Sequence, residues 1–202
     1  MDATTIIDTL RPLVAGAALE AAPSVDFPTI VVPRERIAEV CRALRDTPEL
    51  GFTYLSDLTA ADFHPREPRF EVVYHLVRLG VRDFPAAGDN PAPARVRLKV
   101  RVSGDAATLP TVAGVFPNAN WSERELFDLF GLVFEGHPDL RRILLPDEWE
   151  GHPLRKDYPV QVKVPVQTHE MLQLTAEEFA ANIDRQRSAL GQPPRGDAGA
   201  RS

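Results

Sequence analysis

The chain has 202 residues, 44% hydrophobic content and a formal net charge of −6, enough for one ordinary core with length left for extended segments. The acidic balance argues against a nucleic-acid-binding surface or a polybasic membrane anchor, so we expect protein partners. The single cysteine, Cys41, excludes an internal disulfide and an iron–sulfur cluster held by this chain alone. No apolar run is long enough to span a bilayer, and residues 1–20 lack the basic start of a secretory signal.

The first elements alternate between helix and strand. Residues 1–24 form a predicted helical segment, because apolar residues recur at helical spacing through Asp2–Glu20 until Pro12 interrupts them. Thr29–Val32 is β-branched and predicts a short strand, and Arg34–Arg45 then predicts an amphipathic helix with Cys41 on its apolar side.

Three longer strands are predicted over Phe52–Leu58, Phe70–Leu79 and Arg95–Val102, with a loop at Gly80–Ala94. Phe70–Leu79 is apolar on both faces, which indicates a central strand. Arg95–Val102 alternates apolar and cationic residues, which predicts a half-buried antiparallel strand. Four cations on one strand face would suit nucleic-acid binding, but no aromatic residues interleave on that face for base stacking. The cations are therefore interpreted as solvated, as matched by acids on neighbouring strands, or as protection of a sheet edge.

A helical segment is predicted from Leu109 to Phe116, followed by a short helix opening at Ser122. Ser122 and Glu125 have the spacing of a capping box, and Gly131 supplies a left-handed stop. The residues placed for a hydrophobic staple at the helix start are Trp121 and Leu126.

Residues 132–170 predict an extended arm, because prolines recur too often for a helix or a central strand. The arm is also rich in apolar residues, so it must lie either over its own domain or on a partner protein. Domain boundaries are therefore expected at 25–131 for an α+β domain, 132–170 for a partner-binding arm, 171–190 for a C-terminal helix and 191–202 for a disordered tail. Thr175 and Glu178 form a second predicted capping box.

The arm uses one short element twice. Glu135-Gly136-His137-Pro138 recurs as Glu150-Gly151-His152-Pro153, and each copy is followed by leucine and two cations. An acid, a flexible turn, a fixed histidine and a basic pair suit the binding of carboxylates. We expect the cations Arg141 and Arg155 to lie outside the core, where their loss costs the fold little.

The run E-R-E-L-F-D-L-F-G-L-V-F-E-G-H-P-D-L-R-R-I-L, followed by E-G-H-P-L-R-K-D-Y-P, resembles the signature of a known family. That family is the C subunit ("30 kDa") of proton-pumping NADH:quinone oxidoreductase, respiratory complex I. The resemblance is close over Asn118–Pro159 and extends, by the order of elements, from about Val25. Together with the patterns above, it predicts an α+β fold with a mostly antiparallel sheet and packed helices, an extended C-terminal arm and a terminal helix.

The resemblance implies a non-catalytic structural subunit that clasps the D ("49 kDa") subunit near the quinone site. FMN, iron–sulfur clusters and quinone would belong to the complex, which couples electron transfer from NADH to proton translocation, and no cofactor would belong to this chain. The complex would lie at the cytoplasmic side of the cell membrane, with this chain attached peripherally. The residues expected at the partner interface are Glu123, Arg124, Glu125, Asp128, His137, Asp139, Arg141, Arg142, His152, Arg155, Lys156 and Asp157.

Two other functions stay open. One is the equivalent subunit of a related membrane-bound hydrogenase. The other is a stand-alone metal-dependent hydrolase using His137, Asp139, His152 and Asp157, which the wide spacing of the two histidines disfavours. The chain lacks the glycine-rich nucleotide motifs and the nucleophile elbow of common enzyme folds.

Overall fold

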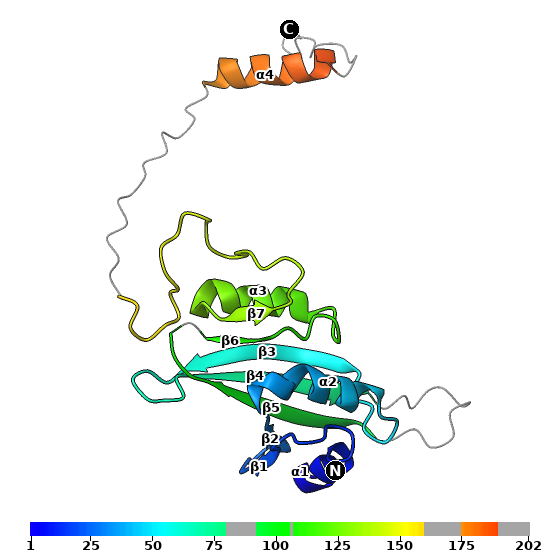
Figure 1. Ribbon diagram of the computed structural model, residues 1–202. Helices are drawn as coiled ribbons and strands as arrows, with labels where there is room; N and C mark the ends of the chain where they lie inside the picture. The colour runs from blue at the N-terminus through cyan, green and yellow to red at the C-terminus, as the bar shows by residue number, and fades with distance from the viewer. Residues whose placement is uncertain (80–91, 106, 160–174, 190–202) are drawn as a thin grey trace, which may run out of the picture. The chain divides into compact units, whose positions relative to one another are not determined.

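The computed structural model describes residues 1–79, 92–105, 107–159 and 175–189. The chain divides into two compact units, Met1–Val160 and Gln161–Ser202. The first unit contains all of the described strands (Figure 1). Within the described residues, no helix is both long and apolar enough to cross a membrane.

The first unit is built on a five-stranded sheet in the order β1-β2-β5-β4-β3. Neighbouring strands run antiparallel except for β2 and β5, so the predicted α+β class with a mostly antiparallel sheet is confirmed. The strands are β1 (Glu20–Ala22), β2 (Thr29–Val31), β3 (Tyr54–Asp62), β4 (Phe70–Arg78) and β5 (Ala94–Val102).

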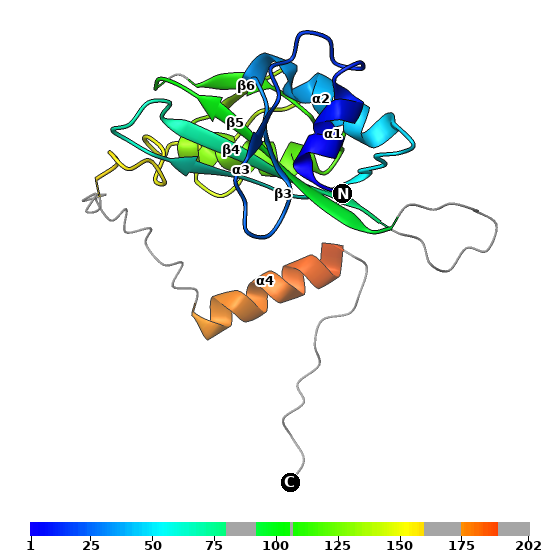
Figure 2. The ribbon, with the colours of Figure 1, turned by 90° about the horizontal axis from the view of Figure 1, so that it is seen from below.

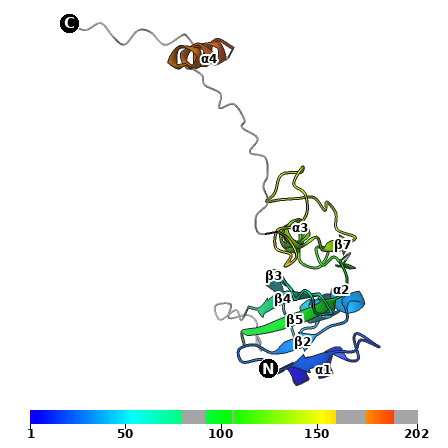
Figure 3. The ribbon, with the colours of Figure 1, turned by 90° about the vertical axis from the view of Figure 1, so that its left-hand side faces the viewer.

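Three α-helices pack with this sheet around one apolar core. Helix α3 lies beyond the β3 edge, while α1 lies near β1 and β2 and beside α2 (Figures 1, 2 and 3). The helices are α1 (Ala3–Leu10), α2 (Ile37–Asp46, after the short 3-10 helix η1, Arg34–Arg36) and α3 (Ala119–Phe130). Cys41 is fully buried in α2, as its spacing predicts.

The alternation on the long strands sorts residues between the core and the open face of the sheet. Alternate side chains of β4 and β5 are buried, as the alternation predicts for β5, and β4 lies between β5 and β3, as predicted for a central strand. The suggestion that β5 is an edge strand is wrong, because β5 lies between β2 and β4. Its outward cations instead meet acids: Arg97 pairs with Asp26 and Lys99 with Glu71, both at 2.7 Å.

The helix predicted over Leu109–Phe116 is wrong. Thr108–Pro110 forms strand β6, which pairs in parallel with β7 (Val133–Glu135), and Leu109 lies opposite Phe134. This pairing joins segments far apart in sequence, so local apolar spacing could not reveal it.

The compact first unit continues past Gly131, the residue at which the sequence predicts the end of the domain. Leu132 and Phe134 are buried in the core, and the following residues pass over the side of α3 away from the sheet (Figures 1 and 3). Residues 132–159 therefore cover their own domain, and we call them the wrapping segment.

In the second unit, α4 spans Ala176–Ala189, within the segment 171–190 in which the sequence predicts a C-terminal helix. The predicted capping box is confirmed: Glu178 N–H donates to Thr175 Oγ1 at 3.2 Å, and Thr175 N–H donates to the Glu178 carboxylate at 2.9 Å. The end of the predicted arm (160–170), the start of the predicted helix, most of the Gly80–Ala94 loop and the predicted tail (191–202) lie outside the described residues.

Candidate functional site

Helix α3 carries the first candidate residues, and its start differs from the prediction. Asn118 stands at the N-cap and its side-chain N–H donates 2.7 Å to the carbonyl oxygen of Leu55, which ties the helix to β3. Ser122 therefore lies inside the helix, and the predicted capping box with Glu125 is wrong. The predicted staple is wrong as well, because Trp121 is 62% exposed.

The end of α3 agrees with the prediction. Gly131 is left-handed, with φ of 72°, and its N–H donates 2.9 Å to the carbonyl of Phe127. A side chain at this position would also collide with the wrapping segment. A Cβ on Gly131 would lie 2.5 Å from His152 Cδ2 and 2.6 Å from Arg155 Nη2.

Asp128 fixes the wrapping segment to the last turn of α3. Its Oδ2 accepts three consecutive backbone N–H groups, from Ile143 at 3.0 Å, Leu144 at 2.7 Å and Leu145 at 2.9 Å. Its Oδ1 lies 2.7 Å from Arg142 Nη1. Burial opposes the charge, but these donors together outweigh it and hold the pKa of Asp128 below its usual range.

The two copies of the repeated turn both contact the backbone of α3. The glycine of each turn has φ of 80°, so the chain reverses in the same way twice. His137 Nε2 lies 3.2 Å from the carbonyl oxygen of Asn120, and His152 Nδ1 lies 2.8 Å from that of Asp128. The duplicated element thus attaches the wrapping segment near the start and near the end of α3.

One cation of each copy also points inward. Arg142 donates to the carbonyls of Trp149 at 2.9 Å and Gly151 at 3.2 Å, bracing the second turn. Arg155 donates 2.6 Å to the carbonyl of Phe130 and 2.9 Å to that of Asp105. Arg155 therefore satisfies an unpaired carbonyl at the C-terminal end of α3, where a cation also suits the helix dipole.

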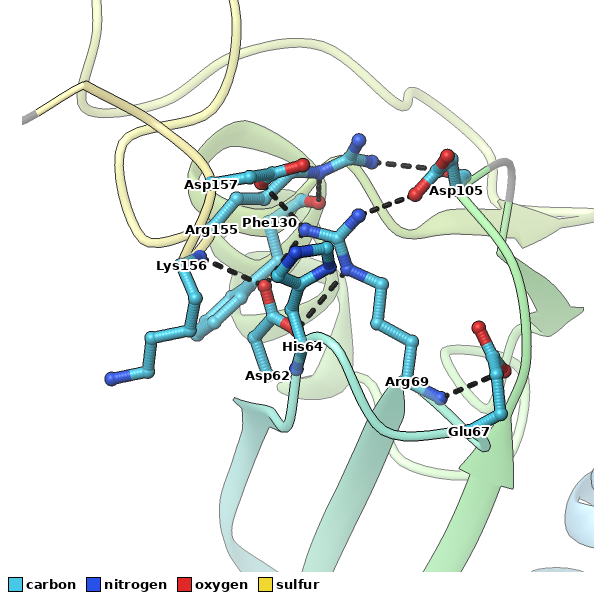
Figure 4. Close-up of polar contacts among 9 residues, drawn as sticks. All are labelled: Asp62, His64, Glu67, Arg69, Asp105, Phe130, Arg155, Lys156 and Asp157. Atoms are coloured by element: carbon cyan, nitrogen blue, oxygen red, sulfur yellow. Dashed lines mark hydrogen bonds and ion pairs between the residues drawn. The ribbon is translucent and has the colours of Figure 1, made fainter.

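A buried arginine joins the end of the wrapping segment to β3 and β4 (Figure 4). The guanidinium of Arg69 pairs with Asp62 at 2.9 Å, with Asp157 at 2.6 Å and with Asp105. The backbone N–H of Lys156 donates 2.9 Å to Asp62. Burial raises the pKa of Asp62, but Arg69 and two backbone donors outweigh it and bring the pKa to about 2.

Three members of this cluster, Asp62, Arg69 and Asp105, are not predicted from the sequence. Asp62 does carry a weak local signal, since it lies in a turn-rich stretch and accepts the N–H of His64 at 2.9 Å. Nothing local connects it with Asp157, because only the fold brings the two together.

Glu123 lies fully buried near the start of α3. It accepts a 2.7 Å hydrogen bond from the N–H of Val112 and another from the Thr111 hydroxyl, and His137 Nε2 lies 3.9 Å away. Burial is the dominant influence and raises the pKa of Glu123 to about 7 despite the two donors.

Arg124 holds the wrapping segment through neutral partners. Its guanidinium donates to the carbonyls of Arg141 at 3.1 Å and Arg142 at 3.0 Å. It also lies 5.3 Å from the ring of Trp121, within the range of a cation–π contact.

The twelve predicted interface residues thus separate by exposure. On α3, Glu123, Arg124 and Asp128 are buried, while Glu125 is exposed. In the wrapping segment the His137 side chain is fully buried, and Arg142, His152 and Arg155 are half-buried. The exposed ones there are Asp139, Arg141, Lys156 and Asp157. Their contact with a partner stays a prediction.

The four residues weighed as a metal site are not brought together as one site. His137 and His152 contact carbonyls at opposite ends of α3, and Asp157 pairs with Arg69. Among the residues that the structure describes, no three His, Cys, Asp or Glu side chains are placed to hold a metal ion.

Comparison with known proteins relates this arrangement to respiratory enzymes. Residues 30–164 match the family described as "Respiratory-chain NADH dehydrogenase, 30 Kd subunit". The C subunit of NADH-quinone oxidoreductase from Roseiflexus sp. (strain RS-1) is 44% identical over 160 residues, which are 79% of this chain and 86% of that protein.

Two solved structures are similar in fold. A trypsin-resistant fragment of Nqo5 shares 35% sequence identity with a TM-score of 0.52, covering 69% of this chain and 100% of the fragment. A chain of the membrane-bound sulfane sulfur reductase, an archaeal respiratory membrane complex, has a TM-score of 0.59 over 98% of this chain and 96% of its own. Its identity is 22%, so this second likeness concerns the fold alone.

Proposed function

Because the chain belongs to the family of the respiratory-chain NADH dehydrogenase 30 kDa subunit, we propose that it is a structural subunit of NADH:quinone oxidoreductase that binds the D ("49 kDa") subunit. In this proposal FMN, iron–sulfur clusters and quinone are held by other subunits. The complex transfers electrons from NADH to quinone and couples the transfer to proton translocation. The chain attaches peripherally at the cytoplasmic side of the cell membrane.

The observation that carries the structural role is that charged side chains of the wrapping segment bond to groups of the chain itself. Arg142, Arg155 and the histidines of both turns bond to α3 or to neighbouring carbonyls, and Asp128 accepts four donors from the segment. These groups are engaged in holding one backbone conformation. Such bonding supports a rigid, preformed surface, which lowers the entropic cost of binding a partner.

Native purification tests the proposal. The full chain, tagged and expressed in its source organism at natural level, is expected to recover the D subunit and the flavin- and cluster-containing subunits, with NADH:quinone activity in the eluate. The separately purified chain is expected to lack the absorption bands of flavin or clusters. Recovery without those subunits would contradict the proposal.

The same experiment separates the alternatives. Recovery of hydrogenase or sulfur-reductase subunits in place of the NADH-oxidising ones would assign the chain to a related membrane complex. A hydrolase would instead show stoichiometric metal in the purified chain and activity lost in His137→Ala.

A further inference from the structure

A groove of about 690 Å³ opens on the first unit beside the Arg69 cluster. Its walls come from the end of β3 and the following loop, from the end of α3 and from the wrapping segment. The lining residues that matter here are Phe63, His64, Arg66, Phe130, Leu154 and Lys156. Of these, only Lys156 is among the interface residues predicted from the sequence.

The groove presents apolar surface to solvent. Phe63 is 36% exposed and Leu154 is 48% exposed, and Phe130, with 8% exposure, also lines the groove. Covering such side chains with a partner removes apolar surface from water, which favours binding. Phe63 follows β3 and Leu154 belongs to the wrapping segment, so apolar surface from two separate segments lines the groove.

The rim of the groove is cationic. Arg66 lies 5.2 Å from the Phe63 ring, and Figure 4 shows the Lys156 side chain leading away from the Arg69 cluster. Within the described part of the chain, neither cation lies within 4.0 Å of a carboxylate oxygen. Asp62 also lines the groove and accepts from Arg69 and from two backbone N–H groups, so the two lining cations, Arg66 and Lys156, exceed the one lining carboxylate.

The walls are fixed before any partner arrives. Leu154 N–H donates 3.0 Å to the carbonyl of Leu129, and the next residues are held by the contacts of Lys156 and Asp157 with Asp62 and Arg69. A preformed groove of this kind binds without a large ordering cost.

We propose that this groove binds an acidic segment of a neighbouring protein subunit, with an apolar side chain against Phe63 and Leu154 and carboxylates against Arg66 and Lys156. The proposal rests on the proposed function, because it takes the partner from the same complex. An anionic membrane surface offers similar charge, but the net charge of −6 opposes approach of the chain to it.

The first test reverses the rim charges in the full chain. Arg66→Glu with Lys156→Glu is expected to weaken retention of the neighbouring subunits about tenfold or more at low salt, and the difference from the wild type should shrink at higher salt because salt screens the charges. The control is Arg42→Glu, an exposed cation on α2, which should retain them like the wild type. The thermal unfolding midpoint of the free chain should stay unchanged in all variants. Equal retention in the double variant and the wild type, or equal loss in the control, would overturn the proposal.

A second test identifies the occupant. A photo-crosslinking amino acid at Leu154 should yield an adduct with a neighbouring subunit, mapped to a peptide that contains Asp or Glu. An adduct with residues 160–174 of the same chain, or binding of the wild type to phosphatidylglycerol vesicles that the double variant abolishes, would assign the groove otherwise and overturn the proposal.

The failure of the groove proposal can be told apart from the failure of the proposed function. If the wild-type chain recovers no respiratory subunit, the proposed function fails too. If the wild type and the double variant recover them equally, only the groove proposal fails.

Discussion

Asp128 Oδ1 and Arg142 Nη1 lie 2.7 Å apart, and this pair joins the last turn of α3 to the segment that wraps it. Asp128→Asn keeps the shape but removes the charge, leaving Arg142 without its carboxylate. We expect the free energy of unfolding to fall by about 2–3 kcal/mol in urea titration. Glu125→Gln, on the exposed face of the same helix, should change it by no more than about 0.5 kcal/mol. Equal midpoints for the two variants would show that the pair is unimportant to the fold.

The arginines of the duplicated element give a matched pair. Arg155→Ala removes the donor to the Phe130 carbonyl and should cost about 1–3 kcal/mol. Arg141 pairs with Asp139 at 2.9 Å on the surface, so Arg141→Ala should cost no more than about 0.5 kcal/mol. Thermal unfolding of the isolated chain measures both. This outcome would correct the expectation from sequence that both arginines lie outside the core, and a silent Arg155→Ala would restore that expectation.

Gly131 is required for its backbone and for the space above it. Gly131→Ala should cost about 1 kcal/mol for the left-handed conformation and about 1–3 kcal/mol more for collision with His152 and Arg155. Gly104 has φ of 80°, and an added methyl group there would have nothing within 4 Å, so Gly104→Ala carries the first cost alone. Comparison of the two chemical denaturation curves separates the two costs, and equal losses would exclude a close approach at Gly131.

How far the sequence predicts this region depends on the range of the interactions involved. The stop at Gly131 and the capping box at Thr175 and Glu178 follow from neighbours in sequence, and both are present. The local pattern places the start of α3 too late, because Asn118 is anchored to Leu55 of another strand.

Charged residues on α3 show the same limit more sharply. Glu123 and Asp128 look like solvated helix residues until the chain returns to cover them. Their partners, Val112 for one and Ile143 to Leu145 for the other, are backbone groups, and a backbone N–H leaves no mark in the amino-acid sequence. The repeat of the turn is visible in the sequence, but its direction, inward to α3, is not.

Glu123 predicts an unusual dependence of stability on pH. Its pKa rises from 4.5 to about 7 on folding, so the folded chain holds the proton more tightly. Protonated Glu123 contributes on the order of 3 kcal/mol to the free energy of unfolding. This contribution is fully present below pH 4.5 and is lost as the pH rises to about 7. Glu123→Gln should flatten this decline when urea midpoints are compared from about pH 4 to about pH 8, the range over which Glu123 loses its proton. Groups shared by both chains cancel in the comparison, and parallel profiles would mean that Glu123 titrates normally.

The central structural claim is that residues 132–159 are held against α3 in the chain alone, before any partner binds. Hydrogen exchange of the isolated protein tests it at the amides of Ile143, Leu144 and Leu145, which donate to Asp128. These amides should be protected in the wild type and should exchange much faster in Asp128→Asn, while the amides of β4 stay protected in both. Exchange at the rate of an unstructured peptide in the wild type, with β4 still protected, would contradict the account and make this segment an arm that folds only on its partner.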